Sequence, residues 1–273
     1  FSTNQAVSEM CNVTTKENWH GGSSTTLLSQ ATGGRGGALC HAGATLSLEN
    51  CKWSGNIAGE TGAAFFLSSN ACATTVNCIV LANLSRPHHI EQHIRSQDVL
   101  TVTNGRSSTG AGGCLYAESS QFSAANSSFI SNQEGEPSSA LCAAQGSRLT
   151  LVNSIVWSNR LELDESSAAT ASYCCIMGGF PGEGNRDQDP RLTHGFRLRS
   201  DSHCIDQGAT TNAPARDFDD EERWDDPAHA NGASIVDIGA DEFVDTDTDT
   251  IAYAWEWSLF PSLLSIGPDS DFD

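Results

Sequence analysis

The chain has 273 residues and carries 34 Asp and Glu against 14 Lys and Arg, which gives a formal net charge of −20 at pH 7. This charge excludes partners such as nucleic acid and anionic membrane surfaces, because contact with phosphates relies on Lys and Arg. No run of 18 apolar residues occurs, so a membrane-spanning helix is also excluded.

One motif recurs four times in the first part of the chain. It begins with Asn followed by Cys or Ser, and it closes with a second Asn. The copies span 50–56, 77–83, 126–132 and 153–159. The first two copies are separated by the same interval as the last two. The middle interval is longer, and it equals one repeat plus an insertion of 22.

Alternating segments, such as 45–49 and 148–152, precede the motif copies. Their period of two predicts β-strands, and no segment from 36 to 160 carries a helical stripe. Short strands at a constant period predict an all-β solenoid whose coils of about 27 residues stack by parallel pairing.

The first Asn of each motif copy is expected at a turn, because Asn tolerates left-handed backbone angles. Stacked amides can also hydrogen-bond along the solenoid axis. The predicted structural column consists of Asn50, Asn77, Asn126 and Asn153.

Several cysteines follow the same repeat. Cys40, Cys114 and Cys142 are expected to share one register, and Cys51 and Cys78 another, as small buried side chains. Two tryptophans of the repeats, Trp53 and Trp157, belong to the core if they point inward and can stack on sugars if they point outward.

The predicted organisation has three parts. Solenoid coils occupy about 1–200, with an insertion loop at about 86–107. A less regular segment, 201–244, covers the open end of the solenoid through Ile238 and Phe243, because exposed strand edges invite aggregation. An acidic tail, 245–273, stops within an unfinished acidic pattern, so we expect the chain to be part of a larger surface protein. Seven acids between 217 and 226 are expected to form a solvated loop.

The repeats resemble those of polymorphic outer-membrane proteins, through Gly36-Gly-Ala-Leu39 and Phe129-Ile-Ser-Asn132. The segments 173–186, 195–209 and 237–244 are similar to the end of bacterial right-handed β-helix proteins of the choice-of-anchor type, although His203 replaces their usual Pro. The resemblance implies a right-handed parallel β-helix of the pectin-lyase-like fold, displayed outside a bacterial cell. It also implies that Cys175 and Cys204 lie near each other, as a disulfide, as two nearby thiols or in unrelated packing.

The tail from 245 resembles a bacterial thrombospondin type 3-like calcium repeat. Asp245, Asp247 and Asp249 stand at loop positions 1, 3 and 5, and Glu256 stands at position 12. Oxygen ligands at these offsets can bind one Ca²⁺. Thr250 replaces the glycine of the sharp turn, so a degenerate repeat or an acidic linker is the alternative.

The sequence therefore predicts a secreted or cell-surface β-helix that displays a non-catalytic face for adhesion or glycan contact. Parallel β-helices include polysaccharide lyases and glycoside hydrolases, so an enzyme is the second hypothesis. The acids of the repeats are sparse, however, and no Gly-His-Gly segment occurs. A purely structural spacer within a larger surface protein is the third hypothesis.

Overall fold

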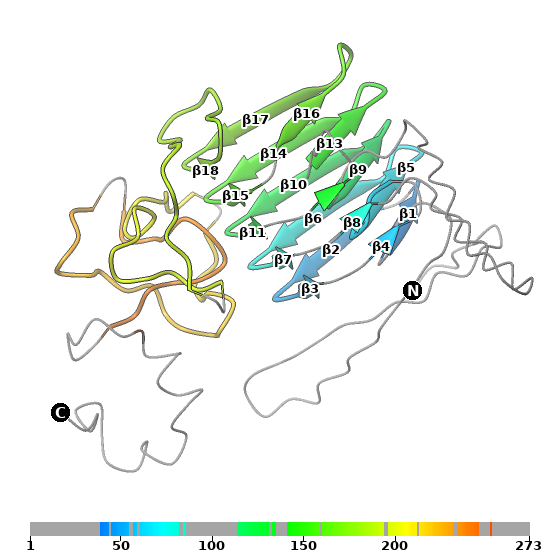
Figure 1. Cartoon of the computed structure of the whole chain (residues 1–273). Helices are drawn as coiled ribbons and strands as arrows, with labels where there is room; N and C mark the ends of the chain where they lie inside the picture. The colour runs from blue at the N-terminus through cyan, green and yellow to red at the C-terminus, as the bar shows by residue number, and fades with distance from the viewer. Residues whose placement is uncertain are drawn as a thin grey trace, which may run out of the picture.

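The computed structural model describes residues 39–43, 45–54, 57–58, 61–81, 84–85, 114–130, 133–134, 141–158, 160–193, 196–211, 213–231, 234–245 and 252. These residues form β-strands and no helix, and the strands stack as a parallel β-solenoid (Figure 1). The all-β, parallel prediction is therefore confirmed. Among the same residues, none belongs to a helix with the length and apolarity needed to cross a bilayer.

Three sheets of five strands and one sheet of three strands make up the walls of the solenoid. The first sheet contains, in spatial order, β1 (Leu39–Ala42), β5 (Phe65–Ser68), β9 (Leu115–Glu118), β13 (Leu141–Ala144) and β16 (Leu161–Leu163). The second contains β2 (Thr45–Glu49), β6 (Cys72–Val76), β10 (Gln121–Ala125), β14 (Arg148–Val152) and β17 (Ala168–Ser172). The third contains β3 (Lys52–Ser54), β7 (Ile79–Leu81), β11 (Ser128–Ile130), β15 (Ile155–Trp157) and β18 (Cys175–Ile176). The short sheet contains β4 (Ile57–Ala58), β8 (Leu84–Ser85) and β12 (Gln133–Glu134).

The register of the second sheet agrees with the predicted period. Thr45 pairs with Cys72, and Gln121 pairs with Arg148, so both pairs are separated by the interval of the Asn motif. Cys72 pairs directly with Gln121 across the longer middle interval, so the two strands lie on adjacent coils and the chain between them holds one coil plus an insertion. The predicted insertion at 86–107 lies outside the described residues.

A further coil follows the four that carry the Asn motif. It consists of β16, β17 and β18, and Arg148 pairs with Ala168, so this coil is shorter than the earlier ones. The motif did not reveal this coil because Tyr173 stands where the earlier coils have Asn. Tyr173 nevertheless adopts the same left-handed angle, with φ of 51°.

The four predicted Asn residues all follow the strands of the second sheet at the corner before the third sheet, with φ between 41° and 50°. Each donates its backbone N–H to the next coil, as from Asn126 to the Val152 carbonyl at 3.1 Å. Their amides, however, bond mainly outside the column. Asn77 donates to Arg216 O at 2.7 Å, and Asn126 donates to Asp237 O at 3.3 Å.

Asn153 makes the most side-chain hydrogen bonds of the four. Its Nδ2 donates to Asn126 Oδ1 at 3.2 Å and to Ala209 O at 2.7 Å, while its Oδ1 accepts the Ala209 N–H at 2.8 Å. The Asn column therefore forms the turns and also hydrogen-bonds to residues between 209 and 237, which are distant in sequence.

The residue after each Asn forms a second ladder along the same corner. Ser154 Oγ donates to the Val152 carbonyl at 2.8 Å and accepts the Ser127 N–H at 3.3 Å. Cys174 Sγ repeats this arrangement with the Ser154 N–H at 3.4 Å. This explains why the motif holds either Ser or Cys at this position, since either side chain can both donate and accept.

The cysteine registers are only partly as expected. Cys51 and Cys78 occupy equivalent positions, directly before the paired Lys52 and Ile79. Cys40 and Cys142 share a column, in which Phe66 and Tyr116 lie between them. The placement of Cys114 in that column is wrong, because Tyr116 occupies the equivalent position.

Apolar side chains fill the interior of the solenoid. The largest of them are fully buried aromatic and aliphatic side chains, such as Phe65, Phe122, Phe129 and Leu149. Trp53 belongs to this core, with 5% exposure and an edge-to-face contact to Phe65 at 4.8 Å between ring centroids. Trp157 is half-buried on the outside of the third sheet. Neither tryptophan therefore presents a fully exposed ring on which a sugar could stack.

We call residues 190–245 the side segment, because they cover the outer face of the third sheet. Ile238, Phe243 and Leu198 pack against Ile79 and Ile155 in a second apolar cluster. Figure 1 shows this yellow and orange part of the chain beside β7, β11 and β15. The expected cover of the open end by Ile238 and Phe243 is therefore wrong, since both residues lie at the side.

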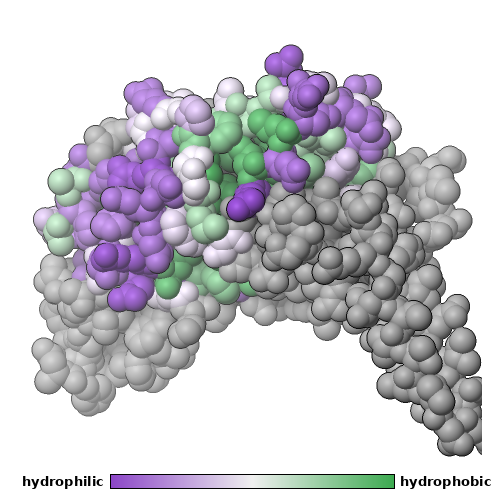
Figure 2. All heavy atoms as spheres, turned by 45° about the horizontal axis from the view of Figure 1, so that its top comes forward, coloured by the Kyte–Doolittle hydropathy of each residue, from purple (hydrophilic) through white to green (hydrophobic). Residues whose placement is uncertain are grey.

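Residues 180–186 close part of the end instead. Phe180 packs on the inner core, and Glu183 and Arg186 pair with the last coil through Tyr173 N–H to Glu183 O at 2.7 Å and Arg186 N–H to Cys174 O at 2.8 Å. Gly182 is required there, because a Cβ would lie 1.8 Å from the Ala171 carbonyl oxygen. Figure 2 shows hydrophobic side chains gathered in the middle of this end of the molecule, between hydrophilic ones.

The Asn column provides a matched pair of variants. Glycine keeps the left-handed angle and removes only the amide. Asn153→Gly should lower the free energy of unfolding by about 2–4 kcal/mol, since three buried hydrogen bonds contribute roughly 1 kcal/mol each. Asn50→Gly should cost much less, because Asn50 is exposed. Urea denaturation measures both values, and equal losses would contradict the assigned role of the Asn153 amide.

Candidate functional site

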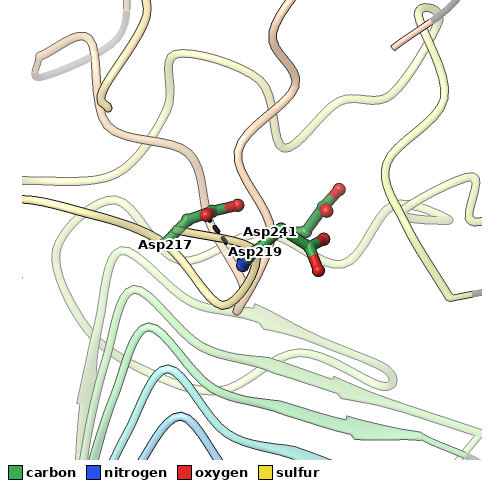
Figure 3. A group of neighbouring side chains, drawn as sticks. All are labelled: Asp217, Asp219 and Asp241. Atoms are coloured by element: carbon green, nitrogen blue, oxygen red, sulfur yellow. Dashed lines mark hydrogen bonds between the residues drawn. The ribbon is translucent and has the colours of Figure 1, made fainter. Parts of the chain in front are cut away.

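A cluster of buried aspartates is the first candidate site. One carboxylate oxygen from each of Asp217, Asp219 and Asp241 lies within 4.8 Å of the others (Figure 3). Within the described part of the chain this is the only such group of potential metal ligands. Asp217 is 1% exposed, Asp219 9% and Asp241 4%.

Asp217 organises the turn that carries the cluster. Its Oδ1 accepts the backbone N–H groups of Asp219 at 2.9 Å and Glu221 at 2.8 Å, and its Oδ2 accepts the Glu242 N–H at 2.9 Å. A carboxylate that accepts backbone N–H groups a few positions later is typical of a tight Asp-initiated turn. The acidic spacing 217, 219, 221 is thus a folded turn. The solvated loop expected for 217–226 is wrong for Asp217, Asp219 and Asp226, which are buried.

Arg197 supplies positive charge to the other two aspartates. Its Nη2 donates to Asp219 Oδ1 at 2.7 Å, and its Nε lies 3.2 Å from Asp241 Oδ1. The guanidinium carbon also lies 5.1 Å from the centre of the Phe218 ring. Asp241 Oδ2 accepts the Leu198 N–H at 2.6 Å. The cluster therefore ties three stretches of the side segment together.

Negative charge exceeds positive charge in this cluster. Burial, followed by the charge of Asp219, raises the pKa of Asp217 to about 7. Burial and the charges of Asp217 and Asp241 raise the pKa of Glu221 to about 9. Both carboxylate oxygens of Glu221 are buried and have no hydrogen-bond partner within the described residues. Protons therefore balance part of the charge at neutral pH.

The aspartates also have the oxygen chemistry that Ca²⁺ prefers. Their oxygens already accept backbone N–H groups or pair with Arg197, however, so a cation here would compete with an arginine. The arrangement fits a structural acid–arginine cluster better than a dedicated calcium cage.

A second acidic group holds the turn at 237–243. Asp237 accepts the N–H groups of Asp206 and Phe243, both at 2.7 Å. Glu242 pairs with Arg223 at 2.5 Å and accepts the Trp224 N–H at 3.0 Å. The acids of the 237–243 motif thus act as internal hydrogen-bond acceptors.

The structure brings Cys175 and Cys204 together as two buried free thiols. Cys175 lies on β18 and Cys204 in the side segment, and Cys175 Sγ donates to Gln188 O at 3.1 Å. A hydrogen bond with the Cys175 thiol, together with burial, raises the pKa of Cys204 well above its usual value.

The predicted calcium loop is described only at its first ligand. Asp245 is 8% exposed. Asp247, Asp249 and Glu256 lie outside the described residues, so the loop stays a prediction.

A polar pocket is the second candidate site. It has a volume of about 270 Å³ and lies at the corner between the first and second sheets. It is lined by turn and strand residues of three successive coils: Asn70, Ala71, Ser119, Ser120, Gln121, Gln145, Gly146 and Arg148. Asn70, Ser119 and Gln145 have φ of 61°, 47° and 54°, so each of the three turns bends sharply at the pocket. No motif in the sequence pointed to it, because the turns share a conformation rather than a residue type.

The pocket continues into a polar outer face on the second sheet. Gln121 and Arg148 are the first residues of β10 and β14, and Ser123 and Thr150 follow them on the same face. Register pairs align one hydroxyl from each coil: Ser47, Thr74, Ser123, Thr150 and Thr170. We call this set the hydroxyl column; its members are spaced by about 4.8 Å, the distance between strands.

The acid cluster predicts how stability depends on pH. Glu221 has a folded-state pKa of about 9, above its ordinary value of 4.5. Its contribution to stability is therefore fully present below the unfolded-state pKa and is lost as pH rises through the folded-state pKa. The melting temperature should therefore fall as the pH rises from about 4.5 to about 9. The neutral variant Glu221→Gln should show a shallower fall in a thermal melt followed by circular dichroism.

The neighbouring Glu222→Gln is the control for this prediction. Glu222 is an exposed residue that pairs with Arg216 at 2.6 Å, so its loss should leave the slope unchanged. If both variants follow the wild-type profile, Glu221 does not carry the pH dependence.

Comparison with known proteins adds no family to this description. No protein-family model matches the chain, and no curated protein or solved structure is significantly similar to it. The geometry of the solenoid, the side segment and the pocket is therefore the basis for a functional conclusion.

Proposed function

We propose that this chain is an extracellular right-handed parallel β-helix of the pectin-lyase-like kind, and that it contacts carbohydrate without catalysis. The supporting observation is the polar pocket at the corner of the second sheet, together with the hydroxyl column beside it. A rigid scaffold that presents aligned polar groups is suited to binding, because little conformational entropy is lost when a ligand is bound.

Carbohydrate fits this surface through hydrogen-bonding chemistry. Amides such as Asn70, Gln121 and Gln145 both donate and accept, and hydroxyls such as Ser119 do the same. Sugar hydroxyls need such mixed partners. The hydroxyl column repeats along the solenoid axis, which suits a chain-like ligand with a regular repeat of its own.

The setting of the molecule is part of the proposal. Its net charge of −20 and its content of only two lysines, Lys16 and Lys52, favour a crowded exterior where negative charge preserves solubility. We propose a secreted or bacterial cell-surface location, within a larger surface protein of the polymorphic outer-membrane protein or choice-of-anchor type.

A glycan microarray with the full chain tests the proposal, followed by calorimetry with the best ligand. The double variant Asn70→Gly, Gln121→Ala should weaken binding at least tenfold, since it removes hydrogen-bonding groups from two coils while glycine keeps the left-handed angle at position 70. Glu162→Ala, which removes an exposed side chain of the first sheet, should bind as the wild type does.

The other hypotheses give different results in the same experiment. Depolymerisation of a bound polysaccharide would show a lyase or hydrolase and overturn the non-catalytic proposal. Absence of binding across the array would favour a structural spacer. Binding that the double variant retains would place the contact outside the pocket.

Calcium is a separate proposal for the tail. Equilibrium dialysis with radioactive Ca²⁺ should show one site that Asp247→Asn and Asp249→Asn together abolish. The matched variant Asp217→Asn, Asp219→Asn should retain that site, because Arg197 and backbone N–H groups already occupy the buried carboxylates. Loss of binding in the second variant alone would move the site to the buried cluster.

A further inference from the structure

Arg148 differs from most arginines that the structure describes. Six of the others bond to an acid, a side-chain amide or a backbone carbonyl: Arg186, Arg191, Arg197, Arg199, Arg216 and Arg223. Arg148 is exposed at the start of β14, and its side chain has no ion pair or hydrogen-bond partner within the described residues. In a chain with 34 acids, this leaves a guanidinium open to an external anion.

The surroundings of Arg148 favour an anion that also offers hydroxyl groups. None of the eight residues that line the pocket is acidic. The neighbouring acid Asp164 lies on the next coil, where its carboxylate accepts the Gln145 N–H at 2.7 Å and the Ser166 N–H at 3.0 Å. The Asp164 carboxylate is therefore held by N–H groups beside the pocket, and the other side chains that line the pocket are neutral.

The size of the pocket limits the ligand that enters. A volume of about 270 Å³ lies just below the range of roughly 300–1,000 Å³ that holds drug-sized ligands. One sugar ring fits such a volume, whereas a longer chain has to continue along the open face. The planar guanidinium can hold a carboxylate through two parallel hydrogen bonds.

We propose that the pocket binds a carboxylate-bearing sugar, with Arg148 as the residue that recognises the carboxylate. The inference rests on the proposed carbohydrate contact and names its ligand class. Gln121 and Asn70 then bond to the ring hydroxyls, and Ser123 and Thr150 continue the contact along the second sheet.

Calorimetry with paired oligosaccharides tests this inference. One arm uses glucuronate-containing oligosaccharides and the other uses sialylated oligosaccharides, each beside its methyl ester, in which the carboxylate is neutral. The wild type should bind the acid form of one arm at least tenfold more tightly than its ester, and a salt concentration of about 0.5 M should reduce that difference.

Two variants assign the preference to Arg148. Arg148→Gln should remove the preference for the acid and leave the affinity for the ester unchanged. Arg148→Lys should keep part of the preference, because it retains charge without the bidentate geometry. Arg160→Gln, on an exposed arginine outside the pocket lining, is the matched control and should behave as wild type.

Failure of the inference differs from failure of the proposed function. If the wild type binds acid and ester equally, or if Arg148→Gln keeps the preference, the role of Arg148 is overturned and carbohydrate contact stands. If the wild type binds no oligosaccharide in these arms or on the array, the proposed function itself is overturned.

Discussion

Stacking in register is the constraint on which the rest of the structure depends. Each strand bonds to its equivalent in the next coil, so every corner has to turn at the same place in successive coils. At the corner after the second sheet, Asn, or Tyr173 in the last coil, takes the left-handed angle. Ser or Cys follows and joins the backbone of neighbouring coils. The two-residue motif is therefore a geometric requirement of the stack.

The side segment covers an apolar outer face of the solenoid, although its described residues form no strand. Ile79 and Ile155 point outward from the third sheet and need apolar partners, which Ile238 and Phe243 provide. Irregular backbone leaves many N–H groups without sheet partners. Buried carboxylates such as Asp217 and Asp237 accept these N–H groups. The unusual number of buried acids follows from the lack of regular structure.

The repeat made much of the solenoid predictable from sequence. The alternation in 45–49 and 148–152 predicted strands, and the Asn spacing predicted their partners even across the long interval between Cys72 and Gln121. The last coil lies within the predicted range of about 1–200, but the motif did not mark it, because it is shorter than the others and Tyr173 replaces Asn. The misplacement of Cys114 arose because Phe66 and Tyr116, rather than cysteines, occupy the column between Cys40 and Cys142.

The pocket was missed because its turns share backbone angles, which the sequence does not display. The buried acids were read as solvated because their partners, Arg197 and Arg223, act through tertiary contacts.

The side segment also changes how the solenoid folds. Repeat proteins commonly gain and lose structure one repeat at a time, because each repeat contacts only its neighbours. Here Asn77, Asn126 and Asn153, from three successive coils, bond to residues 139, 111 and 56 positions later in the chain. Such distant contacts slow folding and make it more cooperative. During synthesis these three coils can form all of these hydrogen bonds only after residue 237 has left the ribosome. The early coils are therefore fully stabilised only once the side segment has been made.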